Sequence, residues 1–232
     1  RIGDWSSDVC SSDLLYFRKV PKNMTTKAIK TQELILETAL RHFLKEGYAG
    51  ASLRKIVKDA GLTTGAFYKY YPTKEMLFNA LIDPYLEDIY KIYDEIIDQF
   101  EKLSADDQTN NMSYSAEYGL DRMIHYLYNH HDHFKLLFKC GDSGKYEEFI
   151  HNMVDCEIKA TYKYLETMRC AGMDIPEVSD LMMHMVYTGF FSSILQIIEH
   201  DIDKDTAIKI LSQLREFQTG GWERVWGIKF PA

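Results

Sequence analysis

The spacing of apolar residues is the feature that most limits what this chain can fold into. From about residue 35 onward, apolar side chains recur at steps of three and four, and no stretch sustains the strict alternation of a half-buried strand. Prolines are few, and no Asn-Gly or Asp-Gly pair offers a tight hairpin turn. The pattern therefore predicts an all-α fold without a sheet.

The N-terminal part carries signals for three short helices. An apolar stripe predicts a first helix that ends near Gly47, because glycine is common just after helix C-termini. The segment 52–60 predicts a second helix that stops at Gly61, and Thr63 can cap a third helix over 64–70. Two short helices separated by a turn are the layout of a helix-turn-helix.

Longer helices are expected in the rest of the chain. A fourth helix starts at Lys74 and continues towards Leu103, with a kink at Pro84 because the apolar period resumes at once. The polar stretch Ser104–Asn111 is expected to be a loop. Further helices are predicted at about 113–129, 133–139, 145–170, 177–200 and 204–219. We therefore expect a helix-turn-helix domain at 24–75 and a helical bundle for ligand binding and dimerisation at 76–232.

The charge of the chain is divided between these two parts. The net charge is −8, but residues 15–75 hold twelve Lys and Arg against five Asp and Glu, a local charge of +7. Residues 76–232 hold fourteen against twenty-seven, a local charge of −13. A basic segment joined to an acidic one predicts that the N-terminal part meets a polyanion such as double-stranded DNA, although chance asymmetry on solvated faces is the alternative.

The first fourteen residues, RIGDWSSDVCSSDL, are expected to lie outside the fold. They resemble the translated read-through of a common sequencing adapter, and they have neither a helical period nor the apolar core of a signal peptide. We expect this segment to be disordered and Met24 or an upstream codon to be the native start. No run of eighteen uncharged apolar residues predicts a membrane span, and four cysteines without a CxxC pair favour a reducing cytoplasm.

Residues 35–77 resemble the N-terminal domain of TetR/AcrR-type bacterial repressors over its full length. The matching positions have fixed spacing, and Val57 departs mildly from the alanine that is usual there. The matching residues are Ile35, Ala39, Phe43, Gly47, Tyr48, Ser52, Ile56, Ala60, Gly61, Leu62, Thr63, Thr64, Gly65, Ala66, Phe67, Tyr68, Lys69, Tyr70, Tyr71, Lys74 and Leu77.

The resemblance implies which residues contact operator DNA. Small side chains at the start of the third helix allow close approach to the floor of the major groove. Phe67 and Tyr71 are expected to turn inward against the first helix, and Thr63 is expected to act mainly as a cap. The expected DNA-binding residues are Ser52, Arg54, Thr63, Thr64, Gly65, Ala66, Tyr68, Lys69, Tyr70 and Lys74. For Tyr68 and Tyr70, simple packing within a small domain is the alternative.

The last two predicted helices are candidates for a homodimer interface. The helix at 177–200 has apolar residues on nearly every face, so one side can pack on its own domain and another on a second copy. The resemblance implies a four-helix bundle made by two chains; the alternative is a single-chain core. The expected interface residues are Met182, Met185, Phe190, Ile194, Ile197, Leu211 and Leu214.

The helices at 113–170 are rich in aromatic and thioether side chains, which suit an adaptable pocket for a small-molecule effector and suit an ordinary core equally well. The candidate pocket residues are Tyr126, Phe134, Phe138, Met153, Tyr162 and Met185. The run Asn129–His133 suggests a metal site, but a solvated turn is the commoner role of such histidines. We therefore expect neither a metal nor a cofactor.

These features together predict a dimeric, one-component repressor that binds palindromic operator DNA and is released by a small molecule. One alternative is an enzyme that pairs Cys140 with His125 or His133, although no nucleophile elbow, phosphate loop or HExxH motif supports it. The other alternative is a helical module that binds another protein and does not regulate DNA.

Overall fold

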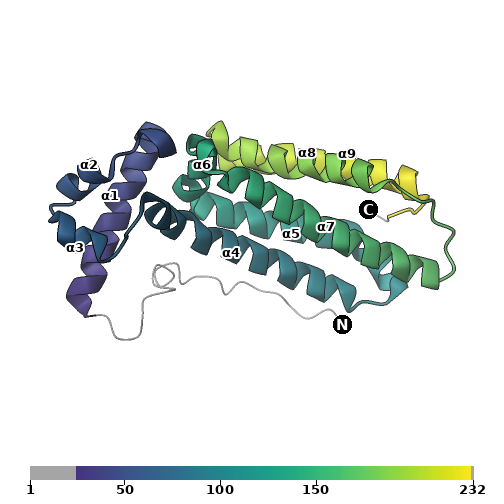
Figure 1. Cartoon of the computed structure of the whole chain (residues 1–232). Helices are drawn as coiled ribbons and strands as arrows, with labels where there is room; N and C mark the ends of the chain where they lie inside the picture. Colours follow the sequence, from purple (N-terminus) through teal and green to yellow (C-terminus); the bar gives the residue numbers. More distant parts are fainter. Residues whose placement is uncertain (1–24, 231–232) are drawn as a thin grey trace.

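The computed structural model describes residues 25–230, and this part of the chain consists of helices and short connections without a strand (Figure 1). The helices are α1 Thr26–Gly50, α2 Leu53–Asp59, α3 Thr64–Tyr68, α4 Lys74–Glu101, α5 Ala105–Asn129, α6 His131–Lys139, η2 Gly141–Ser143, α7 Lys145–Cys170, α8 Asp180–Glu199 and α9 Lys204–Trp226. The all-α prediction is confirmed. The expectations for residues 1–14 and for a start at Met24 lie outside the described residues.

Two groups of helices are visible in Figure 1: α1–α3 at one end of the molecule, and a bundle of the longer helices at the other. Helix α1 buries Ile35, Ala39 and Phe43 completely. Phe67 of α3 is also without exposed surface, so α3 packs on the same small core. Helix α4 begins beside α3 and runs the length of the bundle, which makes it the covalent link between the two parts.

Helix α1 breaks at Gly47, where the sequence predicts its end. Gly47 has φ 71° and ψ 177°, a conformation that is open almost only to glycine. A Cβ at this position would lie 3.0 Å from the carbonyl oxygen of Lys139, at the end of α6. The backbone of α1 therefore passes directly against α6, and both the turn and the close approach require glycine here.

Pro84 lies inside α4, as predicted. A histidine of α6 forms a hydrogen bond with the helical turn that precedes this proline. The Nδ1–H of His133 donates to the carbonyl oxygen of Leu81 over 2.8 Å. The His133 ring also stacks on Tyr85, with ring centroids 3.9 Å apart. Burial is the largest cause that lowers the pKa of His133, to about 4, so the imidazole is neutral at pH 7.

Two predicted boundaries are wrong. Residues 104–111 are not a loop: Ser104 caps α5, and its hydroxyl oxygen accepts a hydrogen bond from the backbone N–H of Asp107 at 3.2 Å. Acidic residues in the first turn suit the positive end of the helix dipole, so this polar stretch is the exposed start of a helix. Helix α9 also does not end at residue 219 but continues through Gly220 and Gly221 to Trp226.

Helix α8 is long and apolar enough, by length and composition, to cross a membrane. Its inner face belongs to the core of the bundle, where Met183, Phe191 and Leu195 keep 3% or less of their surface. Helices α7 and α8 pack along each other, α4 packs on α5, and α5 packs on α9. The apolar composition of α8 is therefore explained in part by burial within the chain.

Candidate DNA-binding surface and ligand cavity

Helix α3 is fixed to the domain by the two aromatic residues that the sequence predicts to point inward. Phe67 is fully buried and Tyr71 keeps 5% of its surface. The Tyr71 hydroxyl accepts a hydrogen bond from Nε2 of Gln32 in α1 at 3.0 Å. The hydroxyl oxygen of Thr63 accepts from the N–H of Ala66 at 3.3 Å, so the predicted cap is confirmed.

The opposite edge of α3 is open. Thr64, Gly65 and Lys69 are exposed, and Tyr68 keeps 41% of its surface. No atom lies within 4 Å of the position that a Cβ on Gly65 would take, so this turn can approach another surface closely. Tyr70 is half-buried against the core, which is closer to the packing alternative than to a free side chain.

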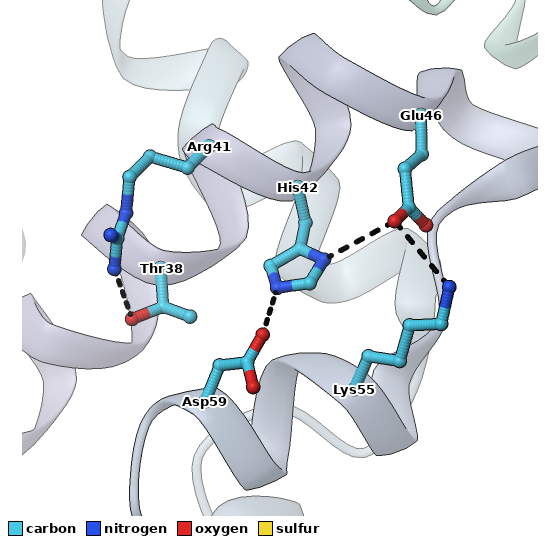
Figure 2. A network of polar contacts seen from close by, with 6 residues as sticks. All are labelled: Thr38, Arg41, His42, Glu46, Lys55 and Asp59. Carbon is cyan, nitrogen blue, oxygen red and sulfur yellow. Dashed lines mark hydrogen bonds and ion pairs between the residues drawn. The ribbon is translucent and has the colours of Figure 1, made fainter.

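Helix α2 is held on α1 by polar contacts that Figure 2 shows from close by. The Nε2 of His42 lies 2.9 Å from Oδ2 of Asp59, and the Lys55 ammonium lies 3.5 Å from a carboxylate oxygen of Glu46. These contacts fix the angle of α2 while Arg54 remains exposed beside it. Ser52 occupies the N-cap position, but its hydroxyl makes no capping hydrogen bond.

Lys74 makes its contacts within the protein. Its Nζ donates to the carbonyl oxygen of Ala49 at 3.2 Å and lies 4.8 Å from the centre of the Tyr48 ring. The side chain is half-buried. It therefore joins the start of α4 to the end of α1, a role that the sequence analysis did not foresee when it assigned Lys74 to DNA binding.

A cavity of about 800 Å³ lies in the C-terminal bundle between α4, α5, α7, α8 and α9. Its walls are mainly apolar and aromatic, as is usual for small-molecule sites. Large side chains in the lining are Tyr93, Leu120, Tyr187, Phe191, Trp222 and Trp226. The two tryptophan rings stack with centroids 4.7 Å apart.

One carboxylate lines this cavity from α7. Glu157 accepts a hydrogen bond from the hydroxyl of Tyr93, and burial raises the pKa of its carboxyl group. The residue nevertheless keeps some accessible surface, which fits a group that borders a cavity. Nearby, the hydroxyls of Thr161 and Tyr187 are 2.8 Å apart and satisfy each other.

Comparisons with known proteins cover two different extents of the chain. The chain is 39% identical over 56 residues to the uncharacterized HTH-type transcriptional regulator YuxN of Bacillus subtilis, which is 24% of this chain and 19% of that protein. It is 40% identical over 55 residues to the HTH-type transcriptional regulator AcrR of Shigella flexneri, 24% of this chain and 26% of that protein. The chain thus matches about a quarter or less of either relative's length.

A solved structure extends the likeness to the whole fold. A TetR-like transcriptional regulator from Rhodococcus sp. RHA1 superposes with a TM-score of 0.53 at 15% identity, covering 85% of this chain and 99% of that one. Residues 35–81 match the family model of bacterial regulatory proteins, tetR family. The N-terminal helices are therefore similar in sequence to the tetR family, and the fold as a whole is similar to that of a TetR-like regulator. The matched residues contain α2, the turn and α3, so the helix-turn-helix prediction is confirmed.

Most of the residues predicted to line a pocket do not line this cavity. Of the six candidates, only Tyr162 lines the cavity. Phe134 and Met153 are buried in the core, with 1% and 0% of their surface exposed. Met185 lies on the outer surface and is 66% exposed. Phe138 packs against Tyr146. The Tyr126 hydroxyl donates to Asp88 at 3.0 Å.

The residues predicted for the dimer interface include both exposed and buried side chains. Met182 and Met185 are exposed at 40% and 66%, which leaves them available to a second copy. Ile194, Ile197 and Leu211 keep only 3%, 7% and 1% of their surface, because they pack inside the bundle of their own chain, so their assignment to the interface is wrong. Phe190 and Leu214 are half-buried, and Phe190 lines the cavity.

Several residues of the cavity were missed by the sequence reasoning. Glu157 was not considered, and the tryptophans of α9 lie beyond residue 219, where the helix was expected to end. A signal was present, because Leu211, Arg215, Trp222 and Trp226 continue the three- and four-residue steps of that helix. Leu181, Ile210 and Phe217, exposed at 67%, 41% and 78%, were likewise omitted from the candidate interface.

The Cys140–His alternative lacks a reactive thiol. Cys140 is fully buried, its Sγ lies 3.8 Å from the carbonyl oxygen of Phe43, and burial raises the pKa of the thiol to about 12. A thiol in this environment is protonated and poorly nucleophilic at pH 7. Across residues 25–230, no group of three His, Cys, Asp or Glu side chains is placed to hold a metal ion.

Proposed function

We propose that this chain is a one-component transcriptional repressor of the bacterial cytoplasm, which binds operator DNA with the exposed edge of α3. The observation that carries the proposal is the division of α3 into two sides. Phe67 and Tyr71 fix the helix to the domain, while Thr64, Gly65 and Lys69 are exposed, with no atom within 4 Å of the position that a Cβ on Gly65 would take. A short helix with small outward residues suits the floor of the major groove.

A second copy is proposed to complete the DNA-binding unit. Exposed apolar side chains project from α8 and α9, where a monomer would leave them in water: Leu181, Met182, Met185, Ile210 and Phe217. Pairing these helices between two chains would form a four-helix interface and place two α3 helices on one DNA face. Half-sites about 34–36 Å apart would then make the operator a palindrome.

The cavity is proposed to be the effector site, and α4 is proposed to transmit its occupancy. The C-terminal half of α4 contributes Tyr93, Ile97 and Phe100 to the cavity, while its N-terminus is bonded to α1 through Lys74. A ligand that fits better when α4 is displaced would favour a state in which the two α3 helices no longer match the operator. Release of DNA then requires only this difference in affinity between the two states.

An electrophoretic shift assay with the DNA upstream of the gene tests the proposal. We expect the purified chain to retard this fragment in dilute buffer, with an affinity that falls steeply with salt because counterions are released. Light scattering should give the mass of two chains. A monomer that leaves every upstream fragment unshifted at low salt would contradict the proposal and favour a protein-binding module.

A further inference from the structure

The cavity in the bundle contains a carboxylate that its apolar walls do not explain. Glu157 borders the cavity from α7, and it accepts a hydrogen bond from the Tyr93 hydroxyl. Within residues 25–230, no lysine, arginine or histidine forms an ion pair with Glu157. A carboxylate that is removed from water without a cation is costly unless a ligand supplies the charge.

A second acceptor lines the same cavity without a partner. Gln108 of α5 keeps only 3% of its surface, and its Nε2 donates to the carbonyl oxygen of Leu103 at 3.1 Å. Its Oε1 is buried and makes no hydrogen bond. The lining also includes the aromatic side chains of Tyr187, Trp222 and Trp226, a residue class whose rings attract cations.

The cations that border the cavity are already engaged or exposed. The Arg215 guanidinium lies 3.8 Å from a Glu117 carboxylate oxygen and donates to the carbonyl oxygen of Ser113 at 3.4 Å. The Lys163 ammonium lies 2.9 Å from Glu101. Arg169 is exposed to solvent. When Glu157 is ionised, its charge is therefore not balanced by these cations.

We propose that this cavity binds a hydrophobic organic cation, with Glu157 as the counter-ion and the aromatic walls around it. This inference rests on the proposed function, since it names the chemical class of the effector for the same site. Quaternary or aromatic cations match an apolar cavity of about 800 Å³ better than hydrated amines do, because they lose less hydration on entry. Binding favours ionised Glu157, so affinity should rise with pH through the raised pKa of its carboxyl group.

Tetraphenylphosphonium and tetraphenylborate test the inference, because these two ions are alike in size and opposite in charge. Calorimetry with the full chain should show saturable binding of the phosphonium and at least tenfold weaker binding of the borate. Glu157→Gln should weaken phosphonium binding at least tenfold, about 1.4 kcal/mol, and remove its pH dependence. The glutamine can still accept the Tyr93 hydrogen bond, so the fold should persist.

Matched controls separate charge from structure. Glu147→Gln removes a carboxylate from an exposed position of the same helix that does not line the cavity, and it should change phosphonium affinity less than twofold. Neutral triphenylphosphine oxide should bind wild type and Glu157→Gln equally. Tighter binding of the borate, or a phosphonium affinity that Glu157→Gln leaves unchanged, would overturn the inference.

The same compounds separate this inference from the proposed function. If the phosphonium binds through Glu157 but never weakens the DNA complex, the ligand class stands and the effector role fails. If only neutral or anionic compounds bind the cavity and release the DNA, the repressor stands and the ligand class fails. DNA affinity of ligand-free Glu157→Gln should equal that of wild type, because the residue lies in the bundle and outside α1–α3.

Discussion

Helices α1–α3 and the bundle of α4–α9 present their functional groups in opposite ways. In the first, the residues proposed to act are exposed on one short helix and are consecutive in sequence, from Thr64 to Lys69. In the second, they enclose a cavity and come from five helices, so that Tyr93 meets Glu157 and Gln108 shares a wall with Trp226. A surface site depends on local spacing, whereas a cavity depends on how distant helices pack.

The largest predicted effect lies at the contact between α1 and α6, which joins the two regions. Gly47→Ala should lower the free energy of unfolding by about 3 kcal/mol, because alanine is strained at this positive φ and its Cβ would meet the Lys139 backbone. Urea denaturation measures the loss. Gly50→Ala is the control: its Cβ would lie 3.6 Å from the Glu46 Cβ, an ordinary contact, and should be neutral or slightly stabilising. Equal stability of both variants would show that α1 can leave α6 without cost.

A single charge should abolish the function of the exposed region without touching the enclosed one. Gly65→Glu places a carboxylate on the open edge of α3, where no atom is within 4 Å, so folding should be unaffected. Repulsion from phosphates should weaken operator binding at least a hundredfold, about 2.7 kcal/mol. Asn110→Glu adds the same charge at an exposed position of α5 and should change DNA affinity less than twofold. Retained operator binding by Gly65→Glu would remove α3 from the interface.

Sequence alone predicted the exposed region closely, for a local reason. The cap at Thr63, the inward turn of Phe67 and Tyr71, and the break at Gly47 each follow from the spacing of a few neighbouring residues. Lys74 is the exception, because its bond to Ala49 spans 25 residues and no local pattern shows it. Within α1–α3, local signals were therefore sufficient for these local features.

The cavity could not be placed by the same reasoning. Phe134 and Met153 are side-chain types that often line pockets, but both are buried in the core. Trp226 lines the cavity from a helix that was expected to end earlier. An aromatic side chain on a buried face contacts either a neighbour or a void. The choice depends on the relative positions of helices, which periodicity does not specify.

The pH dependence of the unfolding free energy tests a buried histidine of the bundle. The folded pKa of His133 is about 4, below its ordinary value, so between these values only the unfolded chain takes up the proton and stability falls as pH falls. Between pH 7.5 and pH 5, His133 should account for a loss of about 2 kcal/mol in unfolding free energy. His133→Asn can donate to the same Leu81 carbonyl without titrating and should show a smaller loss. His125→Gln, at an exposed histidine, should keep the wild-type slope. An unchanged slope in His133→Asn would assign the acid sensitivity elsewhere.

The smallest predicted effects distinguish Lys69, which is proposed to contact DNA, from Lys74, which stabilises the fold. Lys69→Ala should weaken operator binding by about 1 kcal/mol and make its salt dependence shallower by about one ion per lost phosphate contact. Lys74→Ala should lower stability by about 1 kcal/mol, since it removes the Ala49 hydrogen bond and the contact with Tyr48. Lys102→Ala, which removes a lysine paired with Asp98 on the surface, is the control for net charge. If Lys74→Ala flattens the salt dependence as much as Lys69→Ala, then this ammonium leaves Ala49 for a phosphate when DNA binds. In that case the end of α1 is loosened on the operator, and the joint between the two regions takes part in DNA recognition.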